Sequence, residues 1–264
     1  MWNPLKVWRR RRIAGKPVPK HWPETIADAW HGFGRLSSAD QRELLEHVIV
    51  FLAEKRFEGC GGLAVTEAMK VAIAAQACRL LLHRRTDYFP GVYSILLYPA
   101  AYLAPHTEHT DYLVVAEGRE SREGEAWQHG AVVLAWDSVR RGMADDDDGR
   151  NVVLHEFAHA LDMENASAWG VPRLRRGQQA DWAKVFRKEF QALRAKAKNG
   201  EASILDHYGA EDPAEFFAVA TECFFERPKD MNAKHPQLYE QLRQYYWGQT
   251  PGGGGRWRAW LMAA

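Results

Sequence analysis

Cysteine is scarce in this chain of 264 residues, and the three that occur, Cys60, Cys78 and Cys223, lie far apart. An odd number of widely spaced cysteines without a CxxC pair argues against a disulfide framework. No cysteine is well placed to complete a four-ligand structural zinc site either. We therefore expect reduced, buried thiols in a cytoplasmic protein.

An excess of charge of one sign is also missing, because 35 Lys and Arg face 34 Asp and Glu, for a net charge of +1. Bulk charge thus gives no argument for direct binding to nucleic acid or to an anionic membrane. Long apolar runs are absent as well. The most apolar window, residues 71–82, contains Gln76 and Arg79, and it is shorter than the roughly 20 residues that span a bilayer. We expect a soluble protein.

The two ends of the chain differ in composition from its middle. Four arginines occupy residues 9–12 without the apolar run of a signal peptide, and four glycines occupy residues 252–255. The hydrophobic content of 46% is enough to bury the core of one large domain between them. The predicted boundaries are a flexible basic arm at 1–21, one folded domain at 22–251 and a glycine-rich tail at 252–264.

Hydrophobic periodicity predicts helices on both sides of a small sheet. Residues 22 to about 85 have a helical pattern, in which Ser37 or Ser38 can cap one helix and residues 66–82 form another. Short runs rich in β-branched and aromatic residues predict strands at 92–98, 112–116 and 131–136. Helical patterns return at 150–163, 178–198, 212–226 and 239–247. We predict an α+β fold, a mostly helical single domain with a small mixed sheet.

The stretch His155-Glu156-Phe157-Ala158-His159 has the pattern HExxH. Two histidines four apart on a helix project from the same face, one turn from each other, and can bind one zinc ion. Glu156 then lies beside the metal, where it can accept a proton from a bound water. The motif predicts metal-assisted hydrolysis, most often of peptide bonds.

The helix that carries the motif has two distinct sides. Leu154, Phe157, Ala158 and Leu161 fall on a side that can pack into the core, whereas Asp162 falls on the side of the two histidines. Asp162 can accept a hydrogen bond from a ligand imidazole or stiffen its surroundings. The alternative is an ordinary polar residue near a helix end.

A catalytic zinc ion needs a third protein ligand and leaves its fourth position to water. The extended motif HExxHxxGxxH is absent, since Asp162 and Asn165 occupy its last two positions. Glu215 is the favoured ligand, although Asp212-Pro213-Ala214-Glu215 is equally typical of a capped helix start. The sequence leaves open the downstream residues His207, Glu211, Glu215 and Glu222, with the upstream His106 and His109 ranked low.

Two neighbouring segments admit both a functional and a plain structural interpretation. The strand at 132–136, just before the HExxH helix, can align an extended peptide by edge pairing or can simply be core sheet. The run from Asp145 to Asp148 lacks the alternating ligands of an EF-hand. We expect a solvated loop whose negative charge favours the N-terminus of the next helix.

Several stretches together resemble the Mlc titration factor A family of zinc metallopeptidases. The resemblance covers about residues 22–251 and is specific in the combination of its motifs. These are HEFAHALD at 155–162, Asp206-His207-Tyr208 and DPAEFFA at 212–218, with supporting stretches at 73–78, 124–127, 133–136 and 235–239.

The resemblance implies a gluzincin-type site with one zinc ion per chain, bound by His155, His159 and Glu215. Glu156 would be the general base. Tyr208 matches a tyrosine associated with catalysis in the family, and its phenol could donate a hydrogen bond to the oxyanion.

Fold and function follow from the same resemblance. The zincin core would be related to the catalytic core of the anthrax lethal factor protease. The resemblance implies a cytoplasmic peptidase with aminopeptidase activity on small substrates, in a family named for binding a sugar-responsive transcriptional repressor. We expect a zinc-dependent aminopeptidase. The alternative is a regulatory protein that sequesters a repressor and has little peptidase activity.

Overall fold

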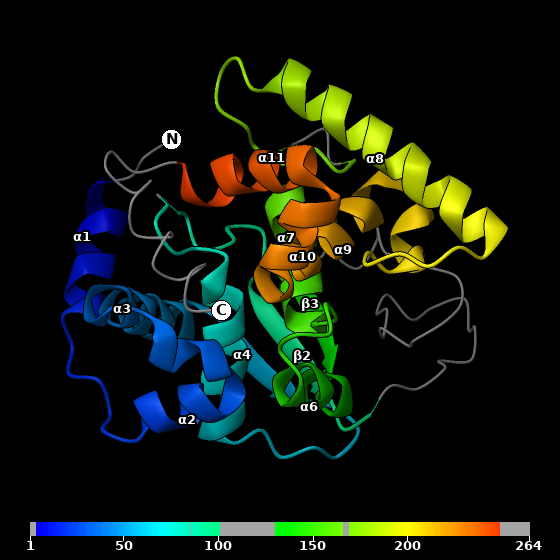
Figure 1. The fold of residues 1–264 in the computed structure, drawn as a ribbon. Coiled ribbons are helices and arrows are strands. Elements are labelled where there is room, and N and C mark those ends of the chain that lie inside the picture. The colour runs from blue at the N-terminus through cyan, green and yellow to red at the C-terminus, as the bar shows by residue number, and fades with distance from the viewer. Residues whose placement is uncertain (1–3, 85, 101–129, 166–168, 249–264) are drawn as a thin grey trace. The chain divides into compact units, whose positions relative to one another are not determined.

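The computed structural model describes residues 4–84, 86–100, 130–165 and 169–248, in which ten α-helices accompany a three-stranded sheet. The chain forms two compact units, residues 1–82 with 92–144 and residues 83–91 with 145–264. The first unit contains α1 (Pro4–Ala14), α2 (Trp22–Ala29), η1 (His31–Arg35), α3 (Ser38–Glu54), β1 (Arg56–Gly59), α4 (Glu67–Arg79), β2 (Ser94–Tyr98), β3 (Ala131–Ala135) and α6 (Trp136–Ala144) (Figure 1).

The second unit is helical in the residues that the structure describes. It contains α7 (Val152–Asp162), α8 (Gln179–Asn199), η2 (His207–Ala210), α9 (Pro213–Glu226), α10 (Pro228–Lys234) and α11 (Pro236–Trp247) (Figure 1). Among all these described helices, none combines the length and the apolar character needed to cross a membrane.

The three described strands form a parallel sheet in the order β1-β2-β3. In register, Ile95 of β2 pairs with Phe57 on one side and with Val132 on the other. Residues 95–97 and 132–135 are continuously buried, as expected for parallel strands covered on both faces. The expectation of a mixed sheet is therefore wrong for these strands. The strand predicted at 112–116 lies outside the described residues, and β1 was not predicted because it is short and half polar.

The predicted helices of the first unit are confirmed, with capped N-termini. The Ser37 hydroxyl accepts a hydrogen bond from the Asp40 amide at 3.1 Å, and the Thr66 hydroxyl accepts one from the Met69 amide at 3.2 Å. The buried polar residues of α4 are also paired: the Gln76 amide donates to the Ala29 carbonyl at 2.5 Å, and the Arg79 guanidinium lies 4.4 Å from the Trp30 ring. Such pairing allows polar groups in a core helix.

The N-terminal segment differs from the flexible arm expected over residues 1–21, because residues 4–14 form α1. Arginine has a high helix propensity, and two of the four arginines have an acidic partner. Arg9 and Arg10 form ion pairs with Glu54, the last residue of α3, at 2.9 Å and 2.7 Å. These ion pairs join α1 to α3. The proposed domain boundary at residue 22 and the tail at 252–264 stay predictions.

The second unit is built around α9, whose residues 215–226 are all buried. Helices α7, α10 and α11 and the short η2 contact it. Phe224 of α9 packs against Tyr246 and Trp247 of α11, with ring centroids 5.7 Å and 4.6 Å apart. Trp182 of α8 stacks on Phe186 at 3.9 Å. An aromatic core therefore holds the helices of this unit together.

The short segment 83–91 of the second unit has an unusual backbone. Three of its residues other than glycine, His83, Tyr88 and Phe89, have positive φ angles of 62°, 57° and 52°. Such conformations cost about 1–3 kcal/mol each. The Phe89 ring is fully buried and meets the ring of Phe157 on α7, edge to face, at 4.7 Å. Packing against α7 thus offsets the strain.

Phe224→Ala is expected to lower the free energy of unfolding by about 3–5 kcal/mol, because it removes a fully buried ring from the aromatic core. Urea denaturation followed by far-UV circular dichroism measures the change. The exposed substitution Lys188→Ala is the control and should change the value by less than about 0.5 kcal/mol. Equal midpoints for Phe224→Ala and the unmutated chain would contradict the central role of this ring.

Candidate metal centre

Helix α7 carries the HExxH motif through the interior of the second unit. It begins at Val152 after Asn151, whose side-chain oxygen accepts a hydrogen bond from the Leu154 amide at 3.1 Å. The apolar side predicted for this helix is buried as expected. His155, Glu156 and His159 are nearly as buried, with 9%, 4% and 6% of their surface exposed. The motif therefore lies in the core and not on an open helix face.

The two histidines converge with a carboxylate from α9. His155 Nε2 lies 3.2 Å from His159 Nε2 and 3.0 Å from Glu215 Oε2. His159 Nε2 lies 3.4 Å from Glu215 Oε1. These atoms form one cluster that could hold a metal ion. Two helices far apart in the sequence thus bring together the residues that the sequence suggested as ligands.

The start of α9 sets the position of Glu215. Asp212 precedes the helix, and its Oδ1 accepts hydrogen bonds from the amides of Ala214 and Glu215 at 2.7 Å and 3.0 Å. Pro213 occupies the first turn, as is typical of a helix N-terminus. The capped helix start and the convergence on the histidines are therefore both present. The backbone of Glu215 belongs to the cap, while its carboxylate faces the imidazoles.

Glu222, which the sequence left open as a ligand, contacts the opposite nitrogen of His155. Its Oε1 lies 2.7 Å from His155 Nδ1, and its Oε2 accepts a hydrogen bond from the Asn151 amide at 2.5 Å. The Asn151 side chain donates to Glu226 Oε1 at 3.0 Å. Glu222 therefore orients a histidine and does not join the cluster. The sequence indicates that Glu222 lies near the site, because its position two turns after Glu215 puts both carboxylates on one face of α9.

The chemistry of this cluster fits a bound metal ion. A carboxylate on Nδ1 of His155 fixes a proton there, which leaves Nε2 as the nitrogen that can bind a metal ion together with Glu215 and His159. Three electron-rich atoms at such distances repel one another unless a proton or a metal ion lies among them. In a tetrahedral site with bonds of 2.0–2.1 Å, ligand atoms are about 3.3 Å apart. The observed 3.0–3.4 Å agree with that arrangement.

Electrostatics of the cluster also favour a cation. The pKa of Glu156 is raised to about 8, mainly by burial. The neighbouring carboxylates of Glu215 and Glu222 also raise this pKa, whereas His155 lowers it. Burial lowers the pKa of His155, but Glu222 and Glu215 outweigh it and raise that pKa well above its usual value. The carboxylates thus make the surroundings of the cluster negative.

Tyr208 lies beside the cluster on η2. Its ring centroid is 5.8 Å from that of His155, with the planes tilted by 38°, and the residue is partly exposed. Asp206 positions this turn, because it accepts a hydrogen bond from the Tyr208 amide at 2.9 Å and forms an ion pair with Arg150 at 2.7 Å. The phenol thus belongs to a turn that is fixed next to the start of α7.

The other residues that the sequence suggested as ligands lie elsewhere. His207 and Glu211 are exposed and are not members of the cluster. His106 and His109 lie outside the described residues. Asp162, considered as a partner for an imidazole, accepts a hydrogen bond from the Gly170 amide at 2.8 Å.

Gly170, the hydrogen-bond partner of Asp162, lies in a tightly packed turn. Its φ of 75° suits glycine, and a Cβ there would lie 2.1 Å from the carbonyl oxygen of Pro213. The Gly170 carbonyl in turn accepts a hydrogen bond from the Trp182 indole at 3.2 Å. Asp162 therefore holds Gly170 beside the start of α9.

An HExxH helix whose histidines meet a glutamate from a neighbouring helix is the arrangement expected of a metallopeptidase. The chain belongs to the family described as glucose-regulated metallo-peptidase M90, whose family model matches residues 5–247. The family resemblance seen in the sequence is thereby confirmed, and a metallopeptidase family implies a metal, for which His155, His159 and Glu215 are the candidates.

Individual relatives match most of the chain. An uncharacterized protein of Synechocystis is 37% identical over 241 residues, which cover 90% of this chain and 88% of the relative. Mlc titration factor A of Escherichia fergusonii is 32% identical over 219 residues, or 82% of each chain. Mlc titration factor A of Cronobacter sakazakii is 30% identical over 248 residues, covering 92% of this chain and 91% of the relative.

Glu222→Gln is expected to weaken the binding of a divalent metal about 10- to 100-fold, because His155 loses the carboxylate that fixes its Nδ1 proton. Competition with a chelator measures the affinity. Glu226→Gln is the matched control, since it makes the same change one turn later in α9, on a carboxylate bonded to Asn151. Equal losses in both variants would mean that buried charge matters and the contact with His155 does not.

Proposed function

We propose that the protein is a zinc-dependent peptidase with a gluzincin-type site. His155, His159 and Glu215 hold one zinc ion per chain, and Glu156 is the general base. The observation that carries this proposal is the convergence of two imidazole nitrogens and one carboxylate within 3.0–3.4 Å in a buried site. Two nitrogens and one oxygen are a common ligand set of catalytic zinc, which keeps its fourth position for water.

The chain's own residues supply the proton transfers of hydrolysis. A zinc ion bound at the cluster would acidify a water molecule and polarise the substrate carbonyl. Glu156 accepts a proton from the water molecule as the oxygen of that water forms a bond to the carbonyl carbon. The same carboxyl then gives that proton to the amine nitrogen as the carbon–nitrogen bond breaks. The products are one carboxylic acid and one amine, without any further reactant.

Tyr208 is proposed as the donor to the oxyanion that develops during this attack. Its partly exposed ring is accessible to a substrate, and it lies beside the ring of His155. A phenol that donates a hydrogen bond to the developing charge stabilises the transition state more than the ground state. The family resemblance supports the same role for Tyr208, and it also supports aminopeptidase activity on small peptides in the cytoplasm.

Glu156→Gln should abolish peptide hydrolysis while zinc remains bound, because glutamine cannot accept the proton and is not a ligand. A loss of about 100-fold or more in kcat is expected, the usual contribution of a general base. A panel of aminoacyl and internally quenched peptides measures turnover, and elemental analysis measures zinc. Retained turnover in the zinc-loaded variant would rule out Glu156 as the base.

Tyr208→Phe removes only the phenol and should lower kcat about 100- to 1,000-fold, the effect of losing one oxyanion donor. KM and zinc content should change little, because the ring stays in place. Tyr93→Phe, at a tyrosine that is 66% exposed in the first unit, is the control with unchanged kcat. An unchanged kcat in Tyr208→Phe would leave this residue with a packing role only.

A second candidate function is favoured by the name of the relatives, Mlc titration factor A. In this alternative the chain sequesters a sugar-responsive transcriptional repressor and has little peptidase activity. Titrating purified Mlc with the unmutated chain and with Glu156→Gln separates the two functions. Binding by both proteins, while the peptide panel stays uncleaved, would favour the regulator. Cleavage of peptides without binding of Mlc would favour the peptidase.

A further inference from the structure

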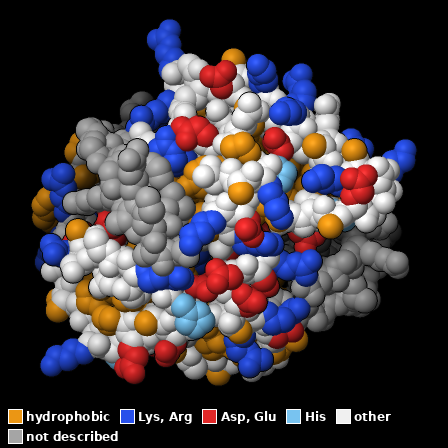
Figure 2. All heavy atoms as spheres, in the orientation of Figure 1, with side chains coloured by type: hydrophobic (Ala, Val, Ile, Leu, Met, Phe, Trp, Pro, Cys, Tyr) orange, Lys and Arg blue, Asp and Glu red, His pale blue; other side chains and the backbone are white. Residues whose placement is uncertain are grey.

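Positive charge is concentrated in one part of the second unit. Between Arg173 and Lys198 the chain has nine basic and two acidic side chains, a net charge of +7, whereas the whole chain has +1 and the remaining residues sum to −6. Figure 2 shows Lys and Arg side chains over the region where α8 runs in Figure 1. The basic residues are Arg173, Arg175, Arg176, Lys184, Arg187, Lys188, Arg194, Lys196 and Lys198.

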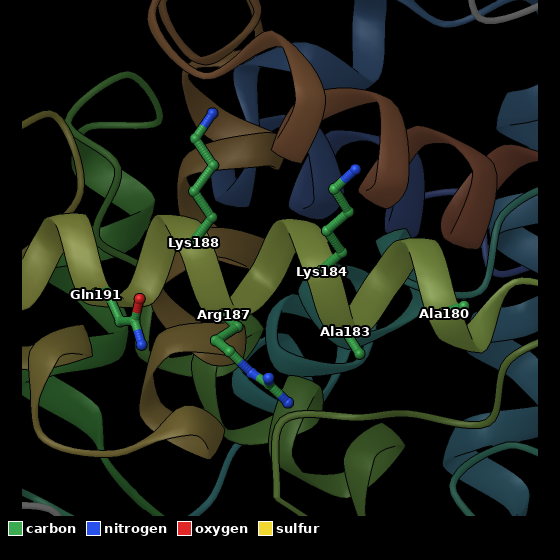
Figure 3. A pocket seen from close by; sticks show the side chains of 6 residues that line it. All are labelled: Ala180, Ala183, Lys184, Arg187, Lys188 and Gln191. Carbon is green, nitrogen blue, oxygen red and sulfur yellow. The ribbon is translucent and has the colours of Figure 1, made fainter.

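Helix α8 has one buried and one exposed side. Trp182, Phe186 and Leu193 are its buried residues. The exposed side includes a shallow hollow of about 400 Å³, whose lining we name the basic stripe (Figure 3). In Figure 3, Lys184 and Lys188 project to one side of the helix and Arg187 and Gln191 to the other. The basic stripe consists of Ala180, Ala183, Lys184, Arg187, Lys188 and Gln191.

Within the described part of the chain, the three cations of the basic stripe form no ion pair. Lys184 and Arg187 form no ion pair there, and Lys188 Nζ donates to the neutral amide oxygen of Gln237 at 3.4 Å. Glu189, which follows Lys188 and attracts it electrostatically, is hydrogen-bonded to His235 Nδ1 at 2.8 Å. The helix dipole favours cations only in the last turn, so it does not explain three of them near the middle of α8.

We propose that the basic stripe is a docking surface for an acidic segment of a partner protein. The methyl groups of Ala180 and Ala183 leave room for a side chain, and the cations around them complement carboxylates. A segment with a few apolar side chains among Asp and Glu matches both properties. The basic stripe would be the surface used in the repressor-binding function proposed above, and its physiological role rests on that function. The metal cluster is not involved.

Two observations favour a protein segment over nucleic acid. The remainder of the chain carries a charge of −6, which would repel a long polyanion extending beyond α8. The basic stripe also offers no aromatic ring for base stacking, since Trp182 and Phe186 lie on the buried side. Cations around small apolar side chains are better suited to mixed acidic and apolar side chains.

The test uses the full chain and a synthetic helical peptide with Glu around a narrow stripe of Leu, about as long as α8. Fluorescence anisotropy measures its affinity. Reversal of three charges in K184E/R187E/K188E should weaken binding about tenfold or more. The matched control R175E/R176E/K198E makes the same charge change at exposed residues outside the hollow, and it should retain affinity within about threefold.

Ala183→Leu tests the hollow without changing charge. Alanine and leucine are both good helix formers, and residue 183 is exposed, so the fold should be unaffected. If the peptide enters the hollow, this variant should also bind it several-fold more weakly. Circular dichroism, zinc content and peptide turnover should be unchanged in all three variants, which separates this inference from the proposed peptidase activity.

Two outcomes would overturn the proposal. Equal losses in both triple variants, with no effect of Ala183→Leu, would reduce the interaction to unspecific attraction between charges. Tighter binding of a short DNA duplex than of the peptide, lost in K184E/R187E/K188E, would assign the basic stripe to nucleic acid instead.

Discussion

The contact between α7 and α9 is the interaction on which the rest of the candidate metal centre depends. It brings His155 and His159 of one helix against Glu215 and Glu222 of the other, all in the interior. Buried ionisable groups are costly unless they are paired. Here His155 has a carboxylate at each ring nitrogen, at 2.7 Å and 3.0 Å. Fold and chemistry therefore share the same contacts in this part of the molecule.

The orientation of these ligands follows from short local motifs. Asn151 and Asp212 cap α7 and α9, and Asn151 in addition binds Glu222 and Glu226. A cap residue that also bonds to the neighbouring helix fixes both the start of its own helix and the separation of the two. The side chains that converge on the cluster thus have little freedom left, which is the general requirement for a preorganised site.

Much of the candidate site was predictable from the sequence. HExxH implies a helix and two convergent histidines by spacing alone, and Asp212-Pro213 marks the start of α9 in advance. The role of Glu222 was not predictable, because the sequence gives its face on α9 but not which nitrogen of His155 it meets. The fold was predictable where periodicity is strong, as in α4, α7 and α8. The parallel direction of β1 and β3 depends on long-range pairing, and α1 depends on Glu54 as a partner for Arg9 and Arg10.

The strained pair Tyr88 and Phe89 has a consequence for how the second unit acquires its structure. Backbone conformations of this kind are unfavourable in an isolated segment, and the buried contact of Phe89 with Phe157 compensates for them only once α7 is formed. Segment 83–91 and the HExxH helix should therefore become ordered together, as parts of one cooperative folding step. The helix that positions the metal ligands would then become ordered only when a segment distant in the chain packs against it.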